Sequence, residues 1–281
     1  MKPLPVWFRV LVRVISVIPA LGAALGWRLF WQLGEPARVR PSEQAFHDSA
    51  RVTRDGDIVS YEWGSGEKVV LLVHGWRSRA SRFAAIGSRL VELGYTVVSF
   101  DARGNGDSAG TRTHALEYAD LVAQLGQRYG RVEAIIAHSL GAVAAFVAVR
   151  NGVRARRIVT ISAPHDFRSV IRTFTTAVGM PPAASRSLAR RIDRWARSQG
   201  IDVWRELVSE LDPTDHATPL LVVHDSGDRE APLEQAMAIV EAHTGPVETL
   251  ITDGLGHNRV LSDPAVVERI AEFVAAPLTV H

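Results

Sequence analysis

The sequence predicts one α/β domain, built on a mostly parallel central sheet flanked by helices and interrupted by a helical cap insertion. Three observations lead to this prediction. After Pro41, short β-branched runs alternate with longer amphipathic segments, which is typical of strand–helix–strand units. The alternation stops at about residues 165–217. The length of 281 residues suits one large domain with an insertion better than two independent domains.

Seven strands are expected from the β-branched and apolar runs, at 58–63, 68–74, 96–101, 132–138, 156–162, 220–225 and 247–252. Between them, apolar residues recur at helical spacing, which predicts helices at 81–93, 113–129, 140–149, 233–243 and 264–275. The domain that these elements build is expected to cover residues 41–281.

The insertion at about 165–217 is too long for a bare loop in a compact domain. An apolar stripe and a basic stripe run side by side through it, formed by Ala184, Leu188, Ile192 and Trp195 and by Arg186, Arg190, Arg194 and Arg197. This pattern predicts an amphipathic cap helix. Its arginines form either a solvated face or a surface that attracts an anionic substrate or a membrane.

Residues 1–40 differ from the rest and are expected to form an apolar helical segment. Residues 6–33 are almost wholly apolar and carry three arginines. The longest uncharged run, residues 14–27, would extend about 21 Å as a helix, whereas a bilayer span needs about 20 residues. We therefore expect a helix that docks on the protein or makes peripheral contact with the inner face of a membrane, in a cytoplasmic protein, in preference to an anchor or a cleaved signal peptide.

Composition excludes several kinds of function. The formal net charge of +2 is too small to indicate nucleic-acid binding. The chain has no cysteine, which excludes disulfides, thiolate zinc sites and a cysteine nucleophile. Any covalent catalysis must therefore use another residue.

Two segments fit the pattern G-x-S-x-G, in which a sharp strand-to-helix turn exposes a nucleophilic serine. The literal match, GDSAG at 106–110, contains Ser108, but six loop residues separate that serine from the strand ending at Asp101 and no helix follows at once. AHSLG at 137–141 has Ala in the first position, yet it joins a strand directly to a helix. Its context is the one the turn requires, so Ser139 is the predicted nucleophile.

A serine hydroxyl needs a base to take its proton and a third group to orient that base. His257 lies in the loop after the last strand, late enough for the order serine, acid, histidine. For the acid we favour Asp228, because it lies beyond the flexible Gly227 and can turn toward the histidine. Asp166, Asp225 and Glu230 remain alternatives, whose other role would be to cap turns.

The reaction also needs hydrogen-bond donors for a developing oxyanion. The backbone amide of Leu140, directly after the nucleophile, is one expected donor. The amide of Trp76, in the loop after the strand at 68–74, is the other.

In this order, these motifs resemble those of α/β-hydrolase-fold serine hydrolases of the esterase and lipase type, over residues 51–276. HGW at 74–76 looks like the family's oxyanion segment, and DARGNGDS at 101–108 is similar to its D-x-R-G-x-G-x-S loop, with Asn105 where histidine is common. The resemblance implies the α/β-hydrolase fold. It also explains Ser108, which belongs to the family's D-x-R-G-x-G-x-S loop.

The predicted function is hydrolysis of a carboxylic ester through an acyl-enzyme intermediate. No metal or organic cofactor is expected, since serine, histidine and backbone amides supply nucleophile, base and charge stabilisation. The apolar N-terminal segment and the cap favour a small-molecule, lipid-like ester as substrate. Thioester, amide or carbon–carbon bond hydrolysis on the same residues is the alternative; a non-catalytic binding module or a membrane-surface scaffold would be a different class of function.

Overall fold

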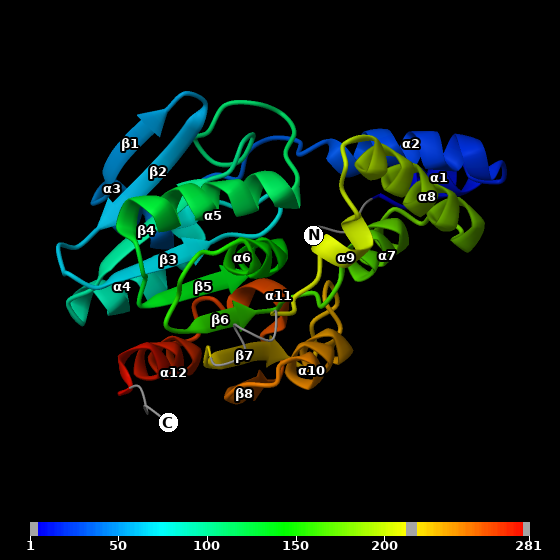
Figure 1. Cartoon of the computed structure of the whole chain (residues 1–281). Coiled ribbons are helices and arrows are strands. Elements are labelled where there is room, and N and C mark those ends of the chain that lie inside the picture. The colour runs from blue at the N-terminus through cyan, green and yellow to red at the C-terminus, as the bar shows by residue number, and fades with distance from the viewer. Residues whose placement is uncertain (1–4, 212–217, 278–281) are drawn as a thin grey trace.

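The computed structural model describes residues 5–211 and 218–277, and its centre is an eight-stranded sheet (Figure 1). Residues 1–4, 212–217 and 278–281 lie outside the described residues. They include the start of the predicted N-terminal segment, the end of the predicted insertion and the end of the predicted domain. The strands are β1 Arg51–Asp55, β2 Ile58–Trp63, β3 Val69–Val73, β4 Thr96–Asp101, β5 Ala134–His138, β6 Ile158–Ile161, β7 Leu220–Asp225 and β8 Val247–Thr252.

The strand order is β1-β2-β4-β3-β5-β6-β7-β8. β2 pairs antiparallel with β1 and with β4, and the pairings from β4 through β3 to β8 are parallel. The predicted mostly parallel sheet is therefore confirmed. Because the carboxyl ends of parallel strands meet at one edge, the loops after β3, β5 and β7 lie on the same side of the molecule.

Helices cover both faces of the sheet (Figure 1). They are α3 Gln44–Asp48, α4 Ala84–Glu92, α5 Ala115–Tyr129, α6 Leu140–Arg150, α10 Leu233–Ala242, α11 Gly256–Arg259 and α12 Pro264–Ala275, with short 3₁₀ turns η1 Pro41–Glu43 and η2 Ala80–Phe83. Alternate side chains of β3 pack into two different hydrophobic cores, one on each face of the sheet. Leu71 and Val73 join the core under α5 and α6, while Val70 and Leu72 join the core over α4 and α12.

Several short or exposed elements were not predicted from the sequence, among them β1, α3 and α11. All five residues of β1 are exposed, so the strand carries no apolar alternation that would reveal it. It pairs with β2 at the sheet edge, where its arginines and aspartate face solvent. Helix α3 has only five residues, which is too short for a helical period to show.

The insertion contains three helices, α7 Phe167–Ala177, α8 Pro182–Ser198 and α9 Val203–Glu206. In α8 the side chains of Ala184, Leu188 and Ile192 are fully buried. The arginines of the basic stripe are exposed on the other side of the helix, at 186, 190, 194 and 197. The cap helix is thus amphipathic in the structure.

The N-terminal segment forms α1 Val6–Ile15 and α2 Pro19–Trp31, and α2 lies beside α8 (Figure 1). The two helices approach closely because α2 presents small residues to α8. A Cβ atom added at Gly22 would lie 2.8 Å from the Cβ of Ala184, and one at Gly26 would lie 3.1 Å from Leu188. Within the ranges that the structure describes, no helix is both long and apolar enough to cross a bilayer.

Candidate active site

Ser139 lies between the end of β5 and the first turn of α6, and its backbone is strained. Its φ of 53° and ψ of −127° are rare for a residue with a side chain. Two glycines make room for the turn. A Cβ at Gly141 would lie 2.4 Å from the carbonyl oxygen of Val73, and one at Gly75 would lie 2.9 Å from the Cβ of Ser139 itself. The strand-to-helix turn thus projects the Ser139 hydroxyl from the sheet edge.

The structure brings Ser139, His257 and Asp228 together from three separate segments: the turn before α6, the short helix α11 and the loop after β7. His257, which was expected in a loop, is the second residue of α11, a helix of four residues that is too short to leave a helical period in the sequence. The Nδ1 of His257 lies 2.7 Å from Oδ2 of Asp228, and its Nε2 lies 3.1 Å from Oγ of Ser139. Since a carboxylate only accepts hydrogen bonds, Nδ1 carries the ring proton and donates a hydrogen bond to Asp228. Nε2 is then left with a lone pair facing the Ser139 hydroxyl, as a general base requires.

The surroundings of Asp228 keep this carboxylate charged. Its side chain is buried, which by itself raises its pKa. The hydrogen bond and charge of His257, together with the backbone amides of Ala231 and Glu230, outweigh burial and hold the pKa of Asp228 below its usual value. A charged, firmly held Asp228 fixes the tautomer of His257.

The other carboxylates considered for this position have structural roles. Asp225 accepts hydrogen bonds from the amides of Gly227 and Leu255 and from the Thr252 hydroxyl. Asp166 caps the first turn of α7 by accepting from the amide of Ser169.

Glu230 lines the same cavity as Ser139, but the histidine is bonded to Asp228. The geometry therefore selects Asp228 among the four acids.

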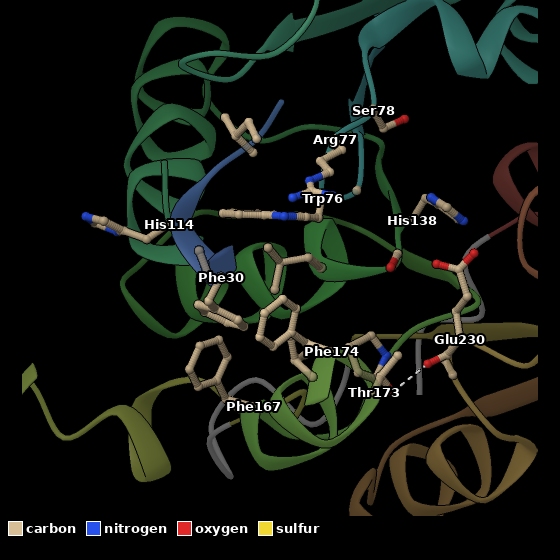
Figure 2. Close-up of a pocket in the computed structure, with 18 of the residues that line it drawn as sticks. Phe30, Trp76, Arg77, Ser78, His114, His138, Phe167, Thr173, Phe174 and Glu230 are labelled. Atoms are coloured by element: carbon tan, nitrogen blue, oxygen red, sulfur yellow. Dashed lines mark hydrogen bonds between the residues drawn. The ribbon is translucent and has the colours of Figure 1, made fainter. Parts of the chain in front are cut away.

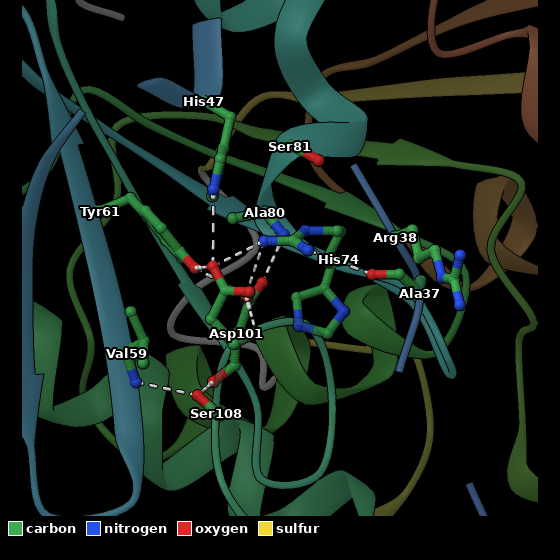
Figure 3. A network of polar contacts seen from close by, with 12 residues as sticks. Ala37, Arg38, His47, Val59, Tyr61, His74, Ala80, Ser81, Asp101 and Ser108 are labelled. Atoms are coloured by element: carbon green, nitrogen blue, oxygen red, sulfur yellow. Dashed lines mark hydrogen bonds and ion pairs between the residues drawn. The ribbon is translucent and has the colours of Figure 1, made fainter. Parts of the chain in front are cut away.

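The serine of the literal motif, Ser108, lies in a buried polar network (Figure 3). Its Oγ donates to the Asp101 carbonyl and accepts from the amide of Val59. It is thus bonded to backbone and serves to attach the loop after β4 to β2.

The same network holds the loop after β3. Asp101 accepts from the amide of Ala80, and Arg79 donates to Asp107 at 2.8 Å and to the carbonyl of Ala37 at 3.1 Å (Figure 3). The loop that carries Trp76 is therefore tied both to β4 and to the chain that follows α2.

The residues of both predicted oxyanion donors, Trp76 and Leu140, line the same cavity as Ser139. Leu140 is the first residue of α6, where amides have no partner within the helix. The peptide between Gly75 and Trp76 is held by its carbonyl, which accepts from Nδ1 of His74 at 2.8 Å and from the Tyr118 hydroxyl at 3.3 Å. Because the N–H of a trans peptide points opposite to its C=O, these two bonds also set the direction of the Trp76 amide.

His138 lies next to His257 but is neutral. Its ring is 4.8 Å from that of His257, and Nε2 donates to the His257 carbonyl at 2.9 Å. Burial lowers the pKa of His138 to about 3, with the neighbouring charge of His257 as the next cause. Through this hydrogen bond His138 has a structural role and supports the backbone of α11 at His257.

A cavity of about 1110 Å³ opens above Ser139 and His257. Figure 2 shows Phe30, Trp76, Phe167 and Phe174 gathered on one side of it, with His138 and Glu230 on the other. The ring of Phe30 lies 5.1 Å from that of Phe174 and 6.3 Å from that of Trp76. The cavity therefore has an aromatic, apolar wall that ends near the candidate nucleophile.

Part of this wall was not predicted from the sequence. Phe30, Trp31 and Leu33 come from the N-terminal segment, and the chain from Gly34 to Arg40 continues along the cavity. Arg77 and Arg82 donate to the carbonyls of Gln32 and Arg38 and so hold this chain against the loop after β3. The spacing of Gly22 and Gly26 in the apolar segment is a sequence signal for close helix packing that could have revealed the docking.

The described residues, 5–211 and 218–277, contain no group of three or more histidine or carboxylate side chains that could hold a metal ion.

Comparisons with known proteins identify the family to which the chain belongs. Residues 70–270 match a model described as the alpha/beta hydrolase family. The human alpha/beta hydrolase domain-containing protein 17B is 27% identical over 205 residues, which cover 71% of this chain and 62% of that protein. The chain thus spans less than two thirds of the length of this curated relative.

Two solved structures share the fold. A membrane phospholipase A described as a bacterial virulence factor superposes with a TM-score of 0.62 and 17% identity, covering 93% of each chain. An esterase from Pyrococcus furiosus superposes with a TM-score of 0.58 and 20% identity, covering 85% of this chain and 95% of its own. With the family model matched over most of the domain, the resemblance seen in the motifs is confirmed, and the chain belongs to the alpha/beta hydrolase family.

Proposed function

We propose that this protein hydrolyses a carboxylic ester through an acyl-enzyme intermediate on Ser139. The observation that carries the proposal is the continuous series of hydrogen bonds from Ser139 through His257 to the buried Asp228, at the floor of an apolar cavity. Family membership alone would not identify the reaction, because one fold supports many functions.

In the first step, Nε2 of His257 takes the proton of Ser139 as Oγ attacks the ester carbonyl carbon. The carbonyl oxygen becomes an oxyanion facing the amides of Leu140 and Trp76. When the tetrahedral intermediate collapses, the bond to the alcohol oxygen breaks, and the alcohol leaves with the proton from His257. Ser139 then carries the acyl group.

In the second step, His257 takes a proton from water, and the water oxygen attacks the acyl carbon. The bond to Oγ breaks, and Ser139 regains a proton from His257. One water is consumed, and one acid and one alcohol are released. Asp228 keeps its charge throughout and stabilises the imidazolium that forms twice.

The cavity supports an apolar acyl group as part of the substrate. Its aromatic wall, formed by Phe30, Trp76, Phe167 and Phe174, offers no charged partner to an acyl chain. Two relatives in fold are described as an esterase and a membrane phospholipase A, which is in keeping with an ester of a fatty acid. We therefore place lipid-like esters ahead of thioesters and amides as substrates.

Labelling with a fluorophosphonate probe tests the nucleophile. Wild-type protein should be labelled covalently, and Ser139→Ala should lose labelling together with at least about 10⁴-fold in ester turnover. Ser108→Ala is the matched control, because that serine belongs to the other motif and bonds to backbone; it should keep labelling.

Folded wild-type protein that stays unlabelled would overturn the proposal in favour of a binding module. Turnover of a thioester or amide panel in preference to matched esters would keep the nucleophile but change the substrate class.

A further inference from the structure

The first two helices carry a large apolar surface that the rest of the protein leaves uncovered. Of the twelve large hydrophobic side chains exposed in the described residues, eight lie between residues 6 and 21. They form what we call the N-terminal apolar surface: Val6, Trp7, Val10, Leu11, Val14, Val17, Ile18 and Leu21, each between 47% and 78% exposed. Such a concentration on one small part of a protein indicates an interaction site.

Helix α1 has the residue distribution of a helix that lies in a membrane interface. At about 100° per residue, Val6, Trp7, Val10, Leu11 and Val14 share an arc of about 140°. Val12, the buried residue of this helix, points to the opposite side. The apolar arc is therefore directed away from the protein.

Positive charge borders this arc. On the same helical wheel, Arg9 and Arg13 fall on one edge of the apolar arc, and both side chains are exposed. Within residues 5–211 and 218–277, neither arginine forms an ion pair, and the sequence has no acidic residue before Glu35. Cationic groups flanking an apolar face complement anionic lipid headgroups.

Helix α2 links this surface to the cavity. One side of α2 packs on the cap through Gly22, Ala23 and Gly26, and its last turn places Phe30 in the cavity wall. Leu21, in the exposed surface, is nine residues before Phe30, about 14 Å along the helix. A membrane bound by the N-terminal apolar surface would thus lie within a short distance of the cavity.

We propose that the N-terminal apolar surface docks the protein on an anionic lipid membrane, with α1 in the plane of the interface and its arginines at headgroup level. Docking there would present the aromatic wall of the cavity to acyl chains held in the same membrane. The inference goes beyond the proposed reaction and is tested separately from it.

The test is co-sedimentation of full-length Ser139→Ala protein with lipid vesicles, so that turnover plays no part. Vesicles of phosphatidylcholine mixed with phosphatidylglycerol should bind the protein more tightly than vesicles of phosphatidylcholine alone. A Val10→Glu, Val14→Glu double variant should lose about tenfold or more in partitioning, because two charged groups replace apolar contacts. Met237→Glu, at a half-exposed position of α10, is the matched control and should bind like the parent.

Two further measurements define the geometry. An Arg9→Gln, Arg13→Gln double variant should lose affinity for the anionic vesicles by about tenfold or more, and little for the neutral ones. Lipids brominated near the headgroups should quench tryptophan fluorescence, and Trp7→Phe should lose part of that quenching.

The proposal would be overturned if the protein bound neither kind of vesicle. It would also be overturned if Met237→Glu lost as much vesicle binding as the Val10→Glu, Val14→Glu variant. A dimer in sedimentation velocity that the Val10→Glu, Val14→Glu variant abolishes would overturn it too, because the surface would then bind a second copy of the chain. In each of these cases fluorophosphonate labelling of wild-type protein still reports on Ser139, so the two proposals fail independently.

Discussion

The tautomer of His257 decides whether Ser139 can lose its proton. With Nδ1–H donating to Asp228, Nε2 faces the serine as an acceptor. An amide at position 228 could donate to Nδ1 instead, which would place the ring proton on Nε2, opposite the serine hydroxyl.

Asp228→Asn should therefore lower kcat for ester hydrolysis by about 10³-fold to 10⁴-fold, with KM changed far less. Steady-state kinetics with a soluble ester measures both constants. Asp225→Asn tests the neighbouring carboxylate, which bonds to Gly227, Leu255 and Thr252 and does not contact the histidine. A larger loss of kcat in Asp225→Asn than in Asp228→Asn would contradict the assignment of the acid.

His138 should make the fold sensitive to acid. Its pKa is about 3 in the folded protein, against 6.5 for an ordinary histidine, because it is buried. Between these values the unfolded chain binds a proton that the folded chain does not, so stability falls as the pH drops from about 6.5 toward about 3.

His138→Gln removes this group while an amide can still donate to the His257 carbonyl. From about pH 6 to about pH 4, the wild type should lose roughly 2 kcal/mol more of its free energy of unfolding than the variant. Urea denaturation at the two pH values measures the difference. Equal losses in the two proteins would show that His138 takes up its proton in the folded state as readily as in the unfolded one.

At the scale of elements, α2 has one side that packs on the cap and an end that lines the cavity. Gly22 and Gly26 bring it close to α8, and Phe30 at its end packs on Trp76 and Phe174. The helix therefore completes the cavity wall as well as filling the groove beside the cap.

Phe30→Ala should raise KM for long-chain esters by about tenfold, since burying an aromatic side chain is worth roughly 1.5 to 3 kcal/mol. Short-chain esters, which would not reach this wall, should be turned over nearly as before. Met237→Ala on α10 serves as the control because that side chain is 50% exposed and lies outside both the cavity and the N-terminal apolar surface. The same change in KM for short and long esters would place Phe30 outside the acyl-binding wall.

Secondary structure was predictable where burial leaves a pattern in the sequence. The bounds expected for β2, β4, β7, β8 and α12 are those of the structure, because each is a β-branched run or a periodic apolar segment with clear ends. β1 was missed for the opposite reason, since all its side chains face solvent. The sequence order of elements also left open that β4 lies between β2 and β3 in the sheet.

The candidate nucleophile was identified from its local context alone, because the elbow needs a strand on one side and a helix on the other. The acid was harder to identify, since Asp225 at the end of β7 and Asp228 in the loop after it are only three residues apart, and the direction of their side chains decides between them. The role of Phe30 was not predictable from local pattern. Apolar periodicity shows which side chains avoid water but does not show which distant element covers them.

On the scale of the whole molecule, the cavity is assembled from segments far apart in the sequence. Phe30 comes from the N-terminal segment, Trp76 from the loop after β3, Ser139 from the elbow and Phe174 from the cap. The sheet fixes the position of the elbow, while the cap and the N-terminal helices form the walls of the cavity above it.

The packing of α2 on α8 also affects how the protein is made. The ribosome produces α2 long before it produces α8, so the face bearing Gly22, Gly26 and Phe30 stays uncovered while the sheet is being synthesised. During that time α2 exposes apolar groups on all its sides, and such nascent helices are prone to aggregate unless a chaperone or a lipid surface shields them. The earliest-made part of the cavity wall is thus among the last to reach its place.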